Sequence, residues 1–249
     1  MSRYFLELAY MGTRYAGFQR QENAPSVQAE VEQVLEKILR THVPLTGSSR
    51  TDAGVHALQN FFHFDIDREL PPSLLYNFNA VLPHDIAIRG LYPVADDAHC
   101  RFDAVSRKYA YHISLTKDPF TYGRAYYFPY RLDIGAMQAA AETLFSYHDF
   151  TSFSKRNTQV KTFLCRIEQS HWEADEKGFV FHVRANRFLR GMVRGLTGTM
   201  LKVGRGKLSV DGFREIIEKK DCTLADFAVP GHGLFLEQVL YPLQLQKNL

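Results

Sequence analysis

The sequence predicts an α+β protein of two halves that share one continuous sheet and divide near residue 104. Residues from Asn60 to Ile66 alternate in the way that is typical of a β-strand. Apolar residues recur at helical spacing from Val27 to Leu39. Because no linker rich in Pro, Gly or Ser separates the halves, we expect one shared sheet rather than two tethered domains.

In the first half, the patterns predict the order strand, helix, strand, helix, strand, with strands at 4–10, 60–66 and 86–94. Ser26 can cap the first helix, and Glu32 is expected to face water with the other charged residues of that helix. The second helix should stop at Pro83. It should bury its apolar side chains, namely Leu74, Leu75, Phe78, Val81 and Leu82.

The second half repeats this theme without detectable sequence repetition. A strand is expected at 105–115, and Asp133 can cap a helix that buries apolar residues as far as Phe145. A hairpin is expected from 163–172 and 179–185, turned at 175–178. The remaining predicted elements are a helix over 188–203, a helix from Ser209 and a final strand over 234–241.

Composition sets the class of protein. The 249 residues are 45% hydrophobic and 23% charged, which is typical of a soluble globular protein, and the net charge of +3 means that a nucleic-acid partner would need a local basic face. Cys100, Cys165 and Cys222 form no C-x-x-C, so we expect reduced thiols. The sequence has no apolar signal region and no membrane-length apolar stretch, so we expect a cytoplasmic protein.

The most unusual stretch is 46–57, which reads T-G-S-S-R-T-D-A-G-V-H-A and holds one carboxylate, Asp52, between Arg50 and His56. Glycines bracket it and a strand follows, so we expect a loop that enters a sheet. Rigid scaffolds often present catalytic groups on such loops. The alternative is that Asp52 only hydrogen-bonds its own turn.

A second unusual stretch is basic and rich in glycine. Arg187, Arg190 and Arg194 follow i, i+3 and i+7 spacing, so we expect them on one face of a helix. Three glycines, Gly191, Gly195 and Gly198, interrupt that helix, and each costs about 0.5 to 1 kcal/mol relative to alanine. They suggest close packing or the close approach of a ligand backbone. The alternative is a solvated basic face, which would leave the glycines unexplained.

Two further stretches place aromatic residues beside cations. Tyr109 lies in R-K-Y-A-Y at the start of a predicted strand, where a ring can stack on a nucleobase while cations hold phosphate. Arg14 and Arg20 lie in an aromatic and basic loop. The sequence has no phosphate-loop, dinucleotide, serine-hydrolase or zinc-ligand motif. Side chains and substrate alone must therefore carry out any chemistry.

With these stretches in view, the chain resembles the tRNA pseudouridine synthases of the TruA family over nearly its whole length. The strongest match is residues 49–57, S-R-T-D-A-G-V-H-A, where the family typically has G-R-T-D-A-G-V-H-A. Supporting matches lie in order at 107–111, 149–153, 186–194, 233–236 and 241–242. Departures are Ser49, the pair Arg190-Gly191 where many members have two histidines, and a loose match at 99–103.

The resemblance implies the pseudouridine synthase fold, with two ferredoxin-like halves of the kind found in RNA-recognition (RRM) domains. These halves share a mostly antiparallel sheet with helices on one side and an RNA-binding cleft on the other. Residues 1–104 would carry the catalytic Asp loop, and 105–249 the active-site Tyr and Arg. The implied activity is isomerisation of uridine to pseudouridine in the tRNA anticodon stem-loop, at tRNA positions 38 to 40. The implied enzyme is a homodimer that uses no cofactor and no metal.

By motif match, the resemblance also assigns roles to residues. Asp52 would attack the ribose or remove a proton from it, and these two routes stay open. Arg194 would keep Asp52 ionised. Tyr109 would stack on the base, and Arg50 would fill the space that the flipped uridine leaves. The expected phosphate contacts are Arg14, Arg20, Arg187 and Arg190.

Three alternatives remain at the level of sequence. The chain could be a non-catalytic RNA-binding protein on the same scaffold, although a carboxylate such as Asp52 in a basic cleft would then repel phosphate without a task. It could be an N-glycoside hydrolase that acts on nucleosides and releases free uracil. It could also carry out the same isomerisation at other RNA positions.

Overall fold

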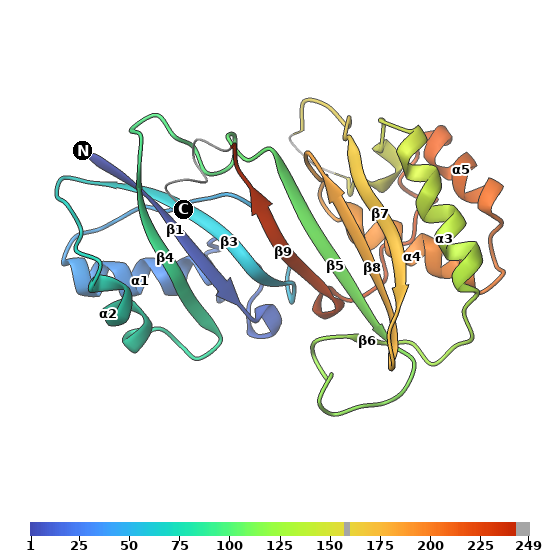
Figure 1. Cartoon of the computed structure of the whole chain (residues 1–249), viewed down its shortest axis with the longest axis horizontal. Coiled ribbons are helices and arrows are strands. Elements are labelled where there is room, and N and C mark those ends of the chain that lie inside the picture. Colours follow the sequence, from blue (N-terminus) through green and yellow to red (C-terminus); the bar gives the residue numbers. More distant parts are fainter. Residues whose placement is uncertain (157–159, 243–249) are drawn as a thin grey trace. The chain divides into compact units, whose positions relative to one another are not determined.

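The computed structural model describes residues 1–156 and 160–242, which separate into two compact units (Figure 1). The first unit comprises Met1–Val105 and residues 236–242, and the second comprises the described residues of Ser106–Phe235. The last strand therefore lies mostly in the first unit, whereas we had assigned it to the second half. Whether the two halves share one sheet and form an RNA-binding cleft depends on how the two units are placed relative to each other. These two features stay predictions.

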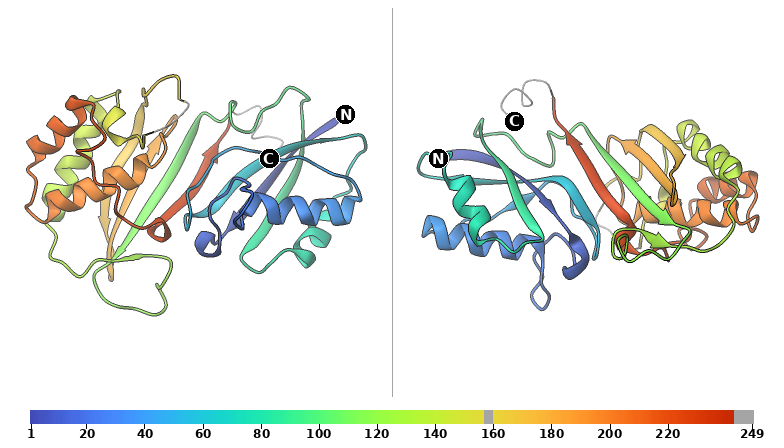
Figure 2. Two further views of the ribbon diagram at one scale, coloured as in Figure 1. Left: turned by 180° about the vertical axis from the view of Figure 1, so that it is seen from behind. Right: turned by 60° about the horizontal axis from the view of Figure 1, so that its bottom comes forward.

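In the first unit, the strands follow the order β4-β1-β3-β9. They are β1 (Ser2–Tyr10), β3 (His56–Ile66), β4 (Ile86–Val94) and β9 (Leu234–Leu240), with the short β2 (Thr46–Gly47) paired to β3. β1 is antiparallel to both β3 and β4. Helices α1 (Val27–Leu39) and α2 (Leu74–Val81) cover one face of these strands (Figure 2).

The opposite face of β1 and β3 is buried as well, although the sequence pattern predicted alternation. Phe61 and His63 are buried on β3, and Phe5 is buried beside them on β1. Tyr241 covers this face, because its ring lies 5.2 Å from Phe61 and 5.4 Å from Phe5. The Tyr241 hydroxyl donates to the carbonyl of Cys100 at 2.6 Å. The end of the described chain therefore closes a second layer of the core.

Helices α1 and α2 lie where the sequence predicted them. The predicted exposure of Glu32 and the predicted burial of some apolar residues of α2 are wrong. Ser26 caps α1, as expected, by accepting from the Ala29 amide at 3.3 Å. Glu32 is only 7% exposed and does not face water, because it has partners inside the unit. In α2, Phe78 is buried and Leu82 just beyond is too, but Leu74 and Leu75 are half-buried and Val81 is 41% exposed. A two-turn helix turns only one narrow side to the core.

In the second unit, three antiparallel strands follow the order β5-β8-β7. They are β5 (Ser106–Ser114), β8 (Gly178–Ala185) and β7 (Ile167–Ala174), and the short β6 (Tyr126–Tyr127) runs parallel to β5. The helices are α3 (Ile134–Thr143), α4 (Met192–Gly204) and α5 (Val210–Lys219). The α+β class, the mostly antiparallel pairing and the hairpin are confirmed.

Two predictions in the second unit are wrong. Asp133 caps α3 as expected, but the helix ends at Thr143 and passes into a 3₁₀ turn, which leaves Phe145 49% exposed. Helix α4 begins at Met192 rather than near Phe188. Gly191, the residue before it, has a left-handed φ of 75°, so the helix cannot extend back through Gly191 toward Phe188. Arg187 and Arg190 therefore precede the helix, and only Arg194 lies on it.

The sequence also predicted reduced thiols and no membrane-spanning helix. Cys100, Cys165 and Cys222 are free thiols, as expected. Across 1–156 and 160–242, no helix combines the length and the apolar character that crossing a membrane requires.

Candidate active site

The Asp52 loop connects β2 to β3 and pairs with residues 15–18. Asp52 forms an isolated antiparallel bridge with Gly17, and the Phe18 amide donates to the Thr51 carbonyl at 3.1 Å. The Gly54 amide donates to the Tyr15 carbonyl at 3.3 Å. Asp52 itself is half-buried. Backbone pairing on both sides of Asp52 therefore fixes the position of its main chain, from which the carboxylate side chain extends.

A buried polar network holds the loop from the β1 side. The Tyr10 hydroxyl lies 2.7 Å from Thr51 Oγ1, and Asn60 Nδ2 donates to the Tyr10 hydroxyl at 3.2 Å and to the Ser49 carbonyl at 2.9 Å. His56 is fully buried, and its Nδ1 accepts from the Gly12 amide at 3.0 Å. His56 thus supports the backbone. Sequence reasoning missed Tyr10 and Asn60, although a lone Asn in an apolar strand was a signal.

Ser49 replaces the family's glycine without backbone strain. Among the described non-glycine residues, positive φ occurs at Arg40 and Lys220, so Ser49 keeps an ordinary conformation. Its amide donates to Asn60 Oδ1 at 3.3 Å. The serine at this position therefore needs no glycine-like backbone conformation.

The predicted substrate-binding arginines of this unit are exposed. Arg50 points from the loop into solvent. Arg14 is 3.3 Å from the Asp85 carboxylate, and Arg20 Nη1 donates to Glu32 Oε2 at 2.9 Å. Both guanidiniums are more than half exposed, so each has donors directed to one carboxylate and a surface turned to solvent.

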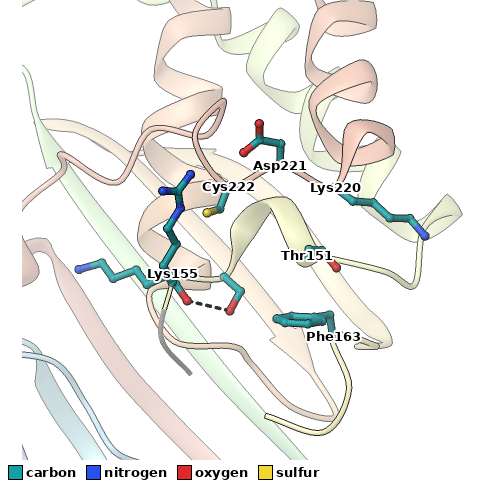
Figure 3. A pocket seen from close by; sticks show the side chains of 8 residues that line it. Thr151, Lys155, Phe163, Lys220, Asp221 and Cys222 are labelled. Atoms are coloured by element: carbon teal, nitrogen blue, oxygen red, sulfur yellow. Dashed lines mark hydrogen bonds between the residues drawn. The ribbon is translucent and has the colours of Figure 1, made fainter. Parts of the chain in front are cut away.

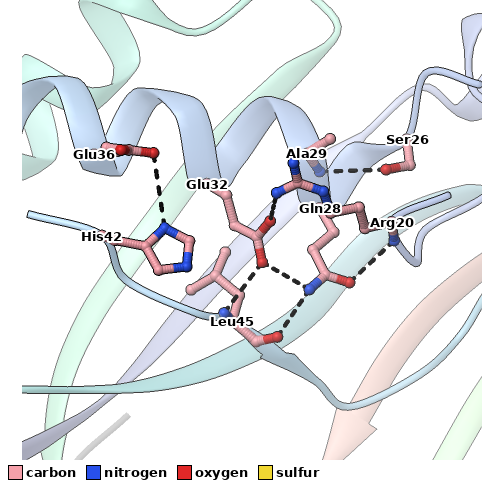
Figure 4. A network of polar contacts seen from close by, with 8 residues as sticks. All are labelled: Arg20, Ser26, Gln28, Ala29, Glu32, Glu36, His42 and Leu45. Carbon is pink, nitrogen blue, oxygen red and sulfur yellow. Dashed lines mark hydrogen bonds and ion pairs between the residues drawn. The ribbon is translucent and has the colours of Figure 1, made fainter. Parts of the chain in front are cut away.

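Glu32 contacts both the residue that leads into the Asp52 loop and the segment that pairs with that loop (Figure 4). Its Oε1 accepts from Gln28 Nε2 at 2.8 Å and from the Leu45 amide at 3.2 Å, while Oε2 takes Arg20. Gln28 Nε2 also donates to the Leu45 carbonyl at 2.9 Å. Leu45 leads directly into β2 and the Asp52 loop, and Arg20 follows the segment that bridges Asp52. One buried carboxylate therefore fixes both segments to α1.

In the second unit, Tyr109 lies on β5 beside the chain that leads to α4. Its half-buried ring meets Phe188 edge to face, with centroids 5.1 Å apart and an interplanar angle of 84°. Arg107 Nη1 donates to the Asn186 carbonyl at 3.1 Å. The structure thus brings the R-K-Y-A-Y segment against the Asn186 to Arg190 segment. Tyr111 in the same motif is buried, and its hydroxyl donates to the Pro230 carbonyl at 2.8 Å.

Arg194 on α4 is held by main-chain carbonyls. Its Nε donates to the Val229 carbonyl at 2.8 Å and its Nη2 to the Phe227 carbonyl at 3.3 Å. Two acceptors on a planar guanidinium fix its direction as well as its position. Sequence reasoning missed this segment, which we call the 226–230 segment.

The glycines of α4 explain how the 226–230 segment reaches Arg194. A Cβ on Gly195 would lie 2.7 Å from the Phe227 ring, and one on Gly198 would lie 2.3 Å from the Asp226 carbonyl. The Asp226 amide donates to Thr199 Oγ1 at 3.0 Å. Of the two explanations that the sequence offered, close packing within the protein accounts for these glycines.

A basic pocket of about 300 Å³ lies in the second unit near the matched 149–153 motif (Figure 3). The Asp149 carboxylate accepts from Thr151 Oγ1 at 2.6 Å and pairs with Lys220 at 2.8 Å. The Lys155 amide donates to the Arg190 carbonyl at 3.0 Å, which links the pocket to the predicted phosphate contacts. The residues that line the pocket are Thr151, Ser154, Lys155, Arg156, Phe163, Lys220, Asp221 and Cys222.

Comparisons with known proteins cover nearly the whole chain. The model of a family described as tRNA pseudouridine synthase matches residues 8–103 and 140–242. This chain belongs to the tRNA pseudouridine synthase family. The tRNA pseudouridine synthase A of Parabacteroides distasonis is 48% identical over 98% of both chains, and that of Porphyromonas gingivalis is 47% identical over 98% of this chain and 99% of its own. That of Staphylococcus aureus MRSA252 is 38% identical over 95% and 91%.

Membership of the tRNA pseudouridine synthase family confirms the resemblance that the motifs predicted. The matched ranges contain Asp52 and Arg50 in the first unit and Arg194 in the second. Tyr109 lies between the two ranges, so its place in the site depends on the local motif and on the full-length relatives. The catalytic and binding roles of these residues stay predictions.

Replacing Glu32 should destabilise the protein. Glu32→Ala leaves the buried Leu45 amide without its acceptor and removes one of the two acceptors of Gln28 Nε2, so we expect a loss of about 2 kcal/mol in the free energy of unfolding measured with urea. The matched control is Glu36→Ala on the same helix, whose exposed carboxylate lies 3.8 Å from His42 and should cost less than about 0.5 kcal/mol. Equal losses in the two variants would show that Glu32 anchors nothing.

Replacing Gly198 should reverse the usual effect of alanine in a helix. Gly198→Ala should cost about 1 to 3 kcal/mol, because the added methyl group meets the Asp226 carbonyl. Gly135→Ala, near the start of α3, is the control, because its added Cβ would lie 3.3 Å from the end of the Asp133 side chain rather than against backbone, and it should cost less than about 1 kcal/mol. Thermal unfolding of both variants measures the difference. A stable Gly198→Ala protein would mean that the 226–230 segment is not held against α4.

Proposed function

We propose that this protein isomerises uridine to pseudouridine in the anticodon stem-loop of tRNA, at tRNA positions 38 to 40. The observation that supports this most directly is the Asp52 loop. It carries the family's strongest sequence match, and it is held by backbone pairing and by a buried polar network. We further propose that the enzyme works in the cytoplasm as a homodimer that binds tRNA, as the family resemblance implies.

Isomerisation needs one group close to the ribose. The N1 to C1′ bond breaks, the base turns over while it stays bound, and a bond forms from C5 to C1′. The proton on C5 is lost and N1 gains one, so the reaction needs no redox partner. Asp52 would form a sugar adduct at C1′ or remove a proton at C2′ to give a glycal. Both routes need an ionised carboxylate.

The other residues would hold the carboxylate and the substrate in place. Arg194 would keep Asp52 ionised through its positive charge, and its fixed direction on the Val229 and Phe227 carbonyls suits that task. Tyr109 would stack on the base. Arg50, exposed on the loop, would fill the space left by the flipped uridine. The proposed phosphate contacts are Arg14, Arg20, Arg187 and Arg190.

The carboxylate is tested by Asp52→Asn. The substrate is unmodified tRNA labelled with tritium at uridine C5, from which the wild-type protein should release tritium. The variant should be slower by about 10³-fold or more, because its side-chain amide replaces the reacting carboxylate. Asp67→Asn, an exposed carboxylate just after β3, is the matched control and should keep full activity. Tight tRNA binding without tritium release from the wild type would favour the non-catalytic alternative. Release of free uracil would favour the hydrolase.

The direction of the Arg194 guanidinium is tested by Arg194→Lys. The charge remains, but an ammonium cannot bind the two carbonyls through a planar fork, so we expect the single-turnover rate to fall at least about tenfold. Arg214→Lys on α5, an exposed arginine, should leave the rate unchanged. An unchanged rate in Arg194→Lys, with normal thermal unfolding, would mean that charge alone suffices.

A further inference from the structure

Three side chains that could bind a metal lie together on the hairpin of the second unit. Ser170 and Trp172 of β7 face the helices, because Ser170 Oγ donates to the Ala141 carbonyl at 2.9 Å and Trp172 Nε1 contacts Met200 Sδ at 3.4 Å. Side chains alternate along a strand. His171 and Glu173 therefore lie on the face of β7 that is turned away from the helices.

The strand register brings a second histidine to the same place. His182 of β8 lies directly opposite His171, and the two rings stack with centroids 5.1 Å apart and an interplanar angle of 22°. Glu173 Oε2 lies 3.4 Å from His182 Nε2. One nitrogen or oxygen atom from each of His171, Glu173 and His182 lies within 4.8 Å of the others.

The distance between Glu173 and His182 lies within the range of an ion pair and also suits two ligands of one metal ion. Charge-assisted hydrogen bonds between nitrogen and carboxylate oxygen are usually about 2.7 to 2.9 Å long. Nitrogen and oxygen ligands lie about 2.0 to 2.2 Å from Zn²⁺, so adjacent ligand atoms of a tetrahedral site are about 3.3 to 3.6 Å apart. The observed 3.4 Å falls in the second range.

We propose that His171, Glu173 and His182 form a binding site for a divalent transition metal of the zinc type. Two imidazoles and a carboxylate are a ligand set that such metals prefer, and the negative charge of Glu173 offsets part of the metal's charge. Three protein ligands leave a fourth position that water or an anion fills. The site uses none of the residues proposed for catalysis, and it does not rest on the proposed function.

A metal at this site would join two neighbouring strands. Among the described strands of the second unit, β7 is the last in the order and has a strand neighbour on one side only. A metal held by His171 and Glu173 of β7 and by His182 of β8 would fasten that strand to its neighbour. Binding to the folded state alone raises the free energy of unfolding with metal concentration.

A second cluster, His63, His99 and Cys100, provides an internal comparison. One nitrogen of each histidine contacts the backbone: His63 Nδ1 accepts from the Cys100 amide at 3.3 Å, and His99 Nδ1 accepts from the Arg101 amide at 3.2 Å. Its cysteine would also mark any bound metal. Co²⁺ on a thiolate absorbs strongly in the near ultraviolet, whereas Co²⁺ on nitrogen and oxygen ligands does not.

The experiment titrates the full-length, chelator-treated protein with Zn²⁺ by calorimetry and with Co²⁺ by absorption. We expect one equivalent of each metal to bind, without a thiolate band, and the unfolding temperature to rise with Zn²⁺. His182→Gln and Glu173→Gln should each weaken binding at least about tenfold. Because the Glu173 side chain is 66% exposed, that variant should fold normally. The controls are His148→Gln, an exposed histidine of the same unit, and Cys100→Ala.

Two outcomes would overturn the proposal. The first is binding that His182→Gln and Glu173→Gln leave unchanged, with or without a thiolate band that Cys100→Ala removes. The second is the absence of binding by the wild-type protein at a hundred micromolar metal. Loss of binding in both hairpin variants, with unchanged binding in His148→Gln and Cys100→Ala, supports the site.

Discussion

Glu32 brings a negative charge into the interior of the first unit, and the chain around Asp52 is arranged to neutralise it. Burying a carboxylate is costly unless hydrogen bonds and a cation compensate for the lost water. Here the Leu45 amide, the Gln28 amide group and the Arg20 guanidinium do so. Leu45 leads into the Asp52 loop, and Arg20 follows the segment that pairs with that loop. The contacts that satisfy this one charge therefore also set the separation of the loop from its paired segment.

The second unit solves a similar problem with main-chain groups. The 226–230 segment supplies the carbonyls that hold the Arg194 guanidinium in a fixed direction. That segment reaches α4 only because Gly195 and Gly198 leave room for it. The helix gives up the stability that alanine would provide at these positions, and it gains an arginine with restricted rotation. Asp52 and Arg194 are thus each held by groups on a neighbouring segment.

Features that depend on neighbours in the sequence could be predicted. The caps at Ser26 and Asp133 and the hairpin of β7 and β8 were correct, because a cap or a tight turn involves only a few adjacent residues. Features that depend on distant partners could not. Nothing near Glu32 indicates that Leu45 and Arg20 will meet it. The start of α4 was predicted too early because apolar residues continue the helical period up to the point where Gly191 turns to positive φ. The motif predicts roles for Asp52 and Arg194, which stay predictions, but it does not indicate the carbonyls that orient Arg194.

The segment that holds Arg194 also returns the chain to the first unit. After Val229, the Pro230 carbonyl accepts from Tyr111, a Cβ on Gly233 would lie 2.7 Å from the Tyr111 ring, and β9 begins one residue later. Only a few residues therefore separate the arginine clamp from the strand that packs with the Asp52 unit. In the second unit, this stretch is held at Val229 and Pro230. An insertion or deletion here would displace the clamp or the strand, so natural variation in chain length should be confined to other loops.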